Sequence, residues 1–172
     1  MPDIHLRDHQ VEAVNAIVRG LDVPPHGIPA NGLRGQVHAA CGTGKTLVAA
    51  ASARRIAPKG RTLVLVPTLD LLAQTVQAGH KGPSVAVCSL QDDPQLWSLK
   101  VRCTTNPIQL ALWHGTGPVT IYATYASLGV LAEAFEGAYG QQLVPSRSVR
   151  HRAKARKSPV SCCALRLRVT RW

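Results

Sequence analysis

The stretch Ala39-Ala40-Cys41-Gly42-Thr43-Gly44-Lys45-Thr46 constrains this chain more than any other, because its end matches a loop that cradles phosphate groups. In such a loop, glycines let backbone N–H groups turn toward the phosphates, a lysine reaches the β- and γ-phosphates, and a threonine hydroxyl ligates Mg²⁺. The strict pattern begins with glycine, and Ala39 stands in that place. We therefore predict that Lys45 is the catalytic cation and that Thr46 is the Mg²⁺ ligand. The predicted phosphate-binding residues are Ala40, Cys41, Gly42, Thr43, Gly44, Lys45 and Thr46.

Both flanks of this loop have a suitable composition, since a phosphate-binding loop lies between a strand and the N-terminus of a helix. Residues 35–40 are short enough to form the strand. Residues 47–55 are rich in alanine and end in Arg54 and Arg55, where cations suit the helix dipole. The alternative is a chance glycine turn before a helix, and the flanks favour the phosphate loop.

Length and composition fit a single globular domain, because the chain has 172 residues of which 45% are hydrophobic. No run of about 18 apolar residues is present, and residues 1–5 do not resemble a signal peptide. We therefore expect no membrane partner and a cytoplasmic location. The five cysteines form no Cys-x-x-Cys pair and are odd in number, so we expect reduced thiols and no disulfide-linked partner. The oligomeric state is left open.

Most of the net charge of +11 comes from one end of the chain. Residues 1–145 hold eleven Lys and Arg and all nine Asp and Glu, whereas residues 146–172 hold nine Lys and Arg and no acidic residue. We therefore predict a domain over residues 1–145 and an irregular, disordered basic tail over residues 146–172.

The apolar pattern of the first 145 residues alternates between strands and helices. A helical period over residues 6–20 precedes a loop rich in proline and glycine. The further predicted strands are residues 61–67, 84–89 and 118–124, and the further helices are residues 69–76 and 128–138. Residues 91–117 have no clear pattern beyond a helix that Pro107 could open. The alternation predicts an α/β domain with a largely parallel sheet and flanking helices.

Several of these stretches, in this order, resemble the first motor domain of the DEAD/DEAH-type, superfamily-two helicases and translocases, a family that includes helicase-like restriction subunits. The loop that begins with Ala39 looks like the family's nucleotide loop. Leu6-Arg7-Asp8-His9-Gln10 resembles an upstream Leu-Arg-x-x-Gln element, whose glutamine reads the adenine edge. The resemblance implies a P-loop, RecA-like parallel sheet with flanking helices, ATP and Mg²⁺ as cofactors, and adenine selection by Gln10.

Two later stretches resemble family motifs that contact nucleic acid. Val64-Leu65-Val66-Pro67-Thr68-Leu69 is similar to a strand-to-helix turn whose Pro-Thr unit holds phosphates, and Ala123-Thr124-Tyr125-Ala126-Ser127-Leu128 looks like the Thr-Tyr-x-Ser-Leu element. Each stretch taken alone is also compatible with an ordinary strand end or helix start. The resemblance implies a nucleic-acid partner, with DNA favoured over RNA. The implied contact residues are Pro67, Thr68, Thr124 and Tyr125.

The resemblance ends near Pro145, before the acidic motif of the family. That motif is an apolar strand ending in Asp-Glu-x-His/Asp, whose Asp holds Mg²⁺ and whose Glu polarises the attacking water. No acidic residue follows Glu136, and Asp92-Asp93 comes too early and does not end an apolar strand. The second motor domain is also missing, so the resemblance implies an incomplete RecA-like domain with impaired ATP hydrolysis.

Two interpretations of residues 146–172 stay open. One is a solvated basic tail that touches nucleic-acid phosphates. The other is translation out of the parent frame from near Pro145, which the acid-free composition, rich in Arg, Ala and Ser, favours. For the whole chain we expect the ATP-binding part of a nucleic-acid-dependent helicase or translocase. The rivals are a nucleic-acid-binding module in which nucleotide is incidental, and a non-functional helicase fragment.

Overall fold

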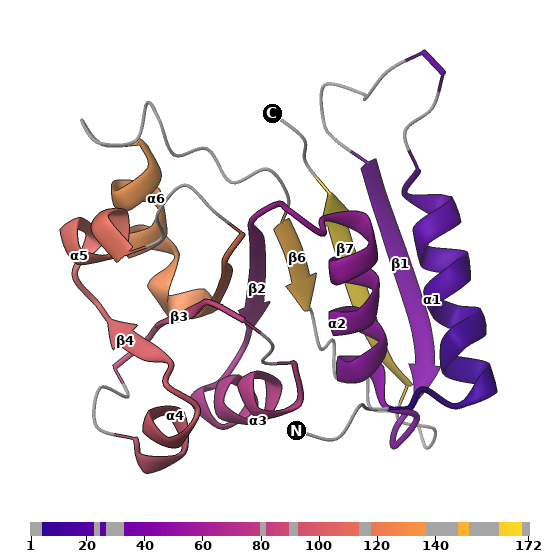
Figure 1. The fold of residues 1–172 in the computed structure, drawn as a ribbon, viewed down its shortest axis with the longest axis horizontal. Coiled ribbons are helices and arrows are strands. Elements are labelled where there is room, and N and C mark those ends of the chain that lie inside the picture. Colours follow the sequence, from indigo (N-terminus) through magenta and orange to yellow (C-terminus); the bar gives the residue numbers. More distant parts are fainter. Residues whose placement is uncertain are drawn as a thin grey trace.

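A computed structural model of the chain describes residues 5–22, 25–26, 33–79, 82–89, 93–113, 118–136, 148–151 and 162–169. A seven-stranded sheet in the order β1-β7-β6-β2-β5-β3-β4 forms its centre (Figure 1). The strands are β1 (Leu33–Ala40), β2 (Thr62–Val66), β3 (Ser84–Val87), β4 (Arg102–Thr104), β5 (Thr120–Thr124), β6 (Ser148–His151) and β7 (Cys162–Val169). The helices are α1 (Asp8–Gly20), α2 (Lys45–Ile56), α3 (Leu69–Gly79), α4 (Pro94–Ser98), α5 (Pro107–Trp113) and α6 (Leu128–Glu136). No helix in these ranges is long and apolar enough to span a membrane.

Strands β2, β5, β3 and β4 form a parallel sheet, which confirms the predicted fold class. Val66 of β2 pairs in register with Thr124 of β5, so these two neighbouring strands end at the same edge. β2 is buried along its whole length, as a continuous apolar run in a parallel sheet should be. Its side chains alternate between two buried faces, with Leu65 on one face and Val64 on the other.

Helices cover both faces of this parallel sheet. Leu110 of α5 and Leu131 of α6 pack on the face that contains Leu65. Leu72 of α3 and Leu96 of α4 pack on the opposite face. All five of these leucines are at most 4% exposed, so the parallel sheet is the centre of a three-layer core.

A separate cluster joins α1 to α2 beside β1. Its apolar core consists of Val14, Ile17 and Leu21 from the α1 side and Val48 and Ala49 from α2. The helical period of residues 6–20 predicted this face, because Val14 and Ile17 are one turn apart. The cluster fixes the first turns of α2 against α1, and so it positions the loop that precedes α2.

Residues 148–151 and 162–169 form the two strands that lie between β1 and β2. β7 pairs antiparallel with β1, and β6 pairs antiparallel with β7 and parallel with β2. The sequence predicted an irregular tail over residues 146–172, and within that range the structure describes these two strands. Apolar and basic residues alternate over Leu165–Val169 with the period of two that a strand has. The pairing of β7 with β1 supplies hydrogen-bond partners for the backbone groups of both strands.

The sheet places three strand ends at one edge. β1 is antiparallel to β7 and β7 is antiparallel to β6, so β1 runs in the same direction as β6 and β2, as their arrows in Figure 1 show. The loop after β1 therefore lies at the same edge as the ends of β2 and β5. In the described part of the chain, β1 is joined to the rest of the sheet only through β7.

Candidate functional site

The predicted phosphate loop connects the end of β1 to the start of α2, in the context that its flanks predicted. Gly42 and Gly44 have φ angles of 80° and 79°, in the left-handed region that side chains disfavour. Gly44 is the N-cap of α2, and its carbonyl accepts the first helical hydrogen bond from Val48 N at 3.1 Å. The preceding N–H groups of α2 have no acceptor within the helix, so they are available to an anion in front of the loop.

Two side chains hold the loop through its own carbonyl groups. Lys45 Nζ donates to Ala40 O at 2.7 Å and to Ala39 O at 3.3 Å. Thr43 Oγ1 donates to the same Ala40 O at 2.8 Å. The Lys45 ammonium is therefore kept at the base of the loop by acceptors that a phosphate oxygen can replace.

Gln10 connects the start of α1 to this loop. Its side chain is only 6% exposed. Gln10 Nε2 donates to Thr43 O at 2.9 Å, and Gln10 Oε1 accepts from Arg7 N at 3.0 Å. A Cβ atom on Gly44 would displace Gln10 Nε2, and the positive φ of Gly44 favours glycine at this position. The fold thus brings Gln10 and Thr43, two of the predicted nucleotide-binding residues, into contact.

A cavity of about 220 Å³ lies beside the loop, between α1, β1 and the start of α2. Thr43 and Lys45 line it from the loop, and His9 and His38 line it from α1 and β1. Sequence reasoning did not single out either histidine. The signal that could have found them is their position, since one precedes Gln10 and the other lies two residues from the end of the strand that enters the loop.

The four predicted nucleic-acid residues lie at the edge where β2 and β5 end. Pro67 and Thr68 are exposed, and Thr68 Oγ1 accepts a hydrogen bond from Leu71 N at 3.3 Å in the first turn of α3. Thr124 is 6% exposed, and its hydroxyl lies 3.0 Å from Ser127 Oγ. Tyr125 is half-buried against the core. The fold brings the four residues together, with Pro67 and Thr68 exposed, Tyr125 partly exposed and Thr124 buried.

The oxygen that the sequence motif assigns to Mg²⁺ is the hydroxyl of Thr46, which lies in the first turn of α2. Within the described ranges, no group of three or more His, Cys, Asp or Glu could hold a metal ion. Asp93 caps α4 by accepting from Gln95 N at 2.7 Å and from Leu96 N at 3.2 Å. Asp92 lies outside the described residues. Mg²⁺ commonly takes one or two protein ligands together with phosphate oxygens, so Thr46 fits a Mg²⁺ ion that arrives with a nucleotide.

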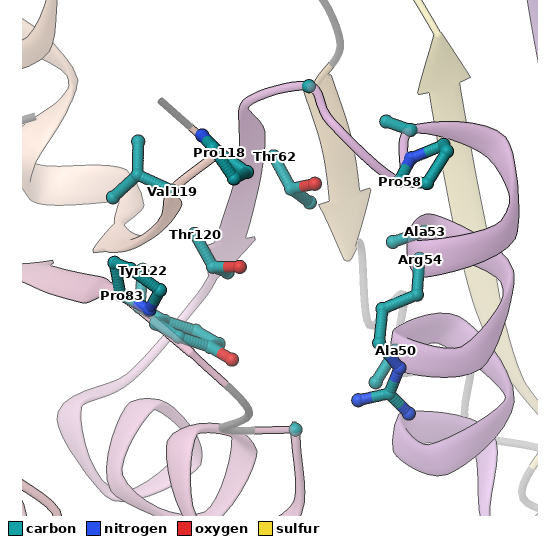
Figure 2. Close-up of a pocket in the computed structure, with 13 residues that line it drawn as sticks. Ala50, Ala53, Arg54, Pro58, Thr62, Pro83, Pro118, Val119, Thr120 and Tyr122 are labelled. Atoms are coloured by element: carbon teal, nitrogen blue, oxygen red, sulfur yellow. The ribbon is translucent and has the colours of Figure 1, made fainter. Parts of the chain in front are cut away.

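A second cavity, of about 320 Å³, lies between α2 and the sheet at the opposite edge (Figure 2). Arg54 of α2 and Tyr122 of β5 extend into it, close to Thr62 and Thr120, where β2 and β5 begin. Burial raises the pKa of Tyr122 to about 12, and the positive charge of Arg54 opposes the rise. Because this cavity lies where the parallel strands begin, it is separate from the loop that follows β1.

Comparisons with known proteins found one protein family and two solved structures that are similar to this chain. Residues 3–84 match the family described as the res subunit of type III restriction enzymes. No curated protein sequence matches the chain.

Two solved structures share the fold. One is a nuclease-deletion mutant of the Type ISP restriction-modification enzyme LlaGI in complex with a DNA substrate mimic, with a TM-score of 0.60 and 25% identity over 78% of this chain. The other is the ATP-dependent Type ISP restriction-modification enzyme LlaBIII bound to DNA, with a TM-score of 0.55 and 25% identity over 78% of this chain. The matched region spans 14% of the LlaGI chain and 10% of the LlaBIII chain.

Proposed function

We propose, from the premise that the chain is a fragment of a superfamily-two helicase motor domain, that it binds ATP with Mg²⁺ through the loop that precedes α2. One observation carries the proposal. Gly44 caps α2 in the left-handed region, and Lys45, the first residue of that helix, holds its ammonium at the same loop, 2.7 Å from Ala40 O. Backbone donors, helix dipole and a cation together form a site for the β- and γ-phosphates.

In the proposed complex, the protein groups act by position and charge. Lys45 leaves Ala40 O and Ala39 O and bonds the β- and γ-phosphates, because a charge-assisted bond to phosphate is stronger than a bond to a neutral carbonyl. The Thr46 hydroxyl would hold Mg²⁺, and Mg²⁺ would supply positive charge to the phosphates.

We propose that hydrolysis is impaired. The usual partner of this loop is an Asp-Glu pair that holds Mg²⁺ and orients the attacking water, and no acidic residue follows Glu136. Asp93 is occupied as the cap of α4. The chain therefore supplies phosphate binding without the groups that position water.

The nucleic-acid surface of this function is the edge at the ends of β2 and β5, with Pro67 and Thr68 as the exposed contacts. DNA is the proposed partner, because both similar enzymes were solved with DNA or a DNA mimic. On this surface, phosphate contacts would fix position without reading sequence.

A second candidate is a nucleic-acid-binding module in which nucleotide is incidental, and the nine Lys and Arg of residues 146–172, with no acidic residue, favour it. Anisotropy of a labelled DNA oligonucleotide separates the two. If the chain is a motor fragment, MgATP changes the DNA affinity of the parent chain and has no effect on Lys45→Ala. If the chain is a binding module, neither protein responds to MgATP and both show the same steep salt dependence.

A further inference from the structure

We propose that the cavity of about 320 Å³ between α2 and the starts of β2 and β5 binds a small organic carboxylate (Figure 2). Arg54 holds the carboxylate group, the Tyr122 hydroxyl is a second donor to it, and the apolar wall of the cavity covers the rest of the ligand. This cavity lies at the opposite edge of the sheet from the phosphate loop. The proposal therefore goes beyond nucleotide binding and does not depend on it.

Polar groups extend into the cavity from both of its walls. Arg54 reaches in from α2, while Tyr122, Thr62 and Thr120 belong to the sheet, and both threonine hydroxyls point toward α2 (Figure 2). Within the described ranges, Arg54 forms no ion pair and the Tyr122 hydroxyl forms no hydrogen bond. Tyr122 is only 3% exposed, and a buried hydroxyl without a partner is costly. A ligand that accepts a hydrogen bond would remove this cost.

The charge of the lining favours a ligand with a single negative charge. Arg54 is the only charged residue among the described residues that line the cavity. Burial raises the pKa of Tyr122 to about 12, so at neutral pH its phenol is uncharged and keeps a proton to donate. The parallel N–H groups of a guanidinium match the two oxygens of a carboxylate. A doubly charged phosphate would keep one charge without a partner, and burying such a charge is unfavourable.

The rest of the described lining is small or apolar. Three alanines, Ala50, Ala53 and Ala57, share one face of α2, and Pro83 and Pro118 lie on the side of the sheet. Because alanine side chains end at Cβ, this face of α2 leaves the space open. The volume is at the low end for small-molecule sites. The ligand that fits this lining is a carboxylate on a small ring or a short branched chain.

The test is an NMR titration of the full ¹⁵N-labelled chain with sodium benzoate, and with benzamide as an uncharged analogue of the same shape. We expect benzoate to shift the backbone amide signals of Gly60 and Thr120, which line the cavity. Benzoate should bind at least about tenfold more tightly than benzamide, because its bond to the guanidinium joins two charged groups. Equal affinities for the two probes, or no shift of these signals, would overturn the proposal.

Three variants assign the bound benzoate to the two donors. Arg54→Gln should lower the benzoate affinity by about tenfold or more, and Tyr122→Phe by roughly three- to tenfold, the effect of a lost hydrogen bond. Arg55→Gln is the matched control, because it removes the same charge from the next residue of α2, whose guanidinium donates to Asn15 Oδ1. Its benzoate affinity should equal that of the parent. Unchanged affinity in Arg54→Gln would contradict the role of Arg54.

Two further measurements separate this site from the phosphate loop and from a phosphate site. Lys45→Ala should bind benzoate as the parent does, and loss of binding in this variant would place benzoate at the loop. Inorganic phosphate at the same concentration should leave benzoate bound. Displacement of benzoate by phosphate would overturn the assignment of a carboxylate ligand.

Discussion

The ammonium nitrogen of Lys45 lies 2.7 Å from the carbonyl oxygen of Ala40, the last residue of β1. The same carbonyl accepts a hydrogen bond from the Thr43 hydroxyl at 2.8 Å. In the proposed complex, a nucleotide would therefore compete with the loop's own backbone for Lys45. Transfer of Lys45 from Ala40 to a phosphate is favourable because the new bond joins two charged groups.

ATP turnover by the chain should be slow. We expect a steady-state rate well below about 1 s⁻¹, the low end for ordinary enzymes, with or without DNA. No acidic residue follows Glu136, so the proposed site has no carboxylate from that part of the sequence to orient water. Phosphate release with and without DNA measures this rate. A DNA-stimulated rate above about 1 s⁻¹ would show that another group replaces the acidic motif.

MgATP should protect Cys41 from alkylation. Cys41 is exposed in the phosphate loop, so bound nucleotide would cover its thiol. At ten times the dissociation constant, we expect roughly tenfold slower modification, measured by mass spectrometry of the Cys41 peptide. Cys103 is the internal control, because its hydrogen bond to Cys88 and its burial raise its pKa and so suppress the reactive thiolate. Equal rates for Cys41 with and without saturating MgATP would place the nucleotide elsewhere.

Stability should fall in alkaline solution through Tyr122. Its pKa is about 12 in the folded chain against about 10 when unfolded, so folding favours the neutral phenol. This stabilisation is fully present below pH 10 and is lost as the pH rises from 10 to 12, at up to about 1.4 kcal/mol per pH unit. Urea unfolding of the parent and of Tyr122→Phe at pH 9, 10 and 11 measures it. The Phe variant should have the shallower slope, and identical slopes would contradict the assignment.

Removal of residues 146–172 should destabilise the β1 side of the sheet. Truncation deletes β6 and β7, which supply the hydrogen-bonded connection between β1 and β2 in the described residues. We expect a lower thermal midpoint and faster amide exchange in β1 than in β5, which keeps its partners β2 and β3. An unchanged midpoint with unchanged exchange in β1 would show that the tail does not support the sheet.

The parts of the fold that could be predicted from the sequence are those that local patterns specify. Short stretches of sequence were enough to predict three features. These are the glycine-lysine loop between a strand and an alanine-rich helix, the buried apolar run of β2, and the helical period of α1. Pro107 does open a helix, α5, as its position suggested. The three-residue strand β4 and the one-turn helix α4 were missed, because elements this short have no detectable period.

Pairing and packing between segments that are distant in the sequence could not be predicted from it. The place of β6 and β7 beside β1 depends on pairing across more than 100 residues, although Leu165–Val169 carries the strand pattern. The burial of Thr124 follows from its register with Val66, which only the sheet sets. The contact between Gln10 and Thr43, 33 residues apart, likewise appears only when α1 packs against α2.

The central claim, that Lys45 binds the phosphates of MgATP, is tested most directly by calorimetric titration of three proteins: the parent chain, Lys45→Ala and Lys59→Ala. Lys59→Ala is the matched control, because it removes an exposed lysine beyond the other end of α2. The loop in Lys45→Ala keeps its backbone donors and loses the cation placed over the β- and γ-phosphates. We predict that the parent and Lys59→Ala bind MgATP with the same affinity and that Lys45→Ala does not bind it. Equal affinity of Lys45→Ala and the parent would contradict the account.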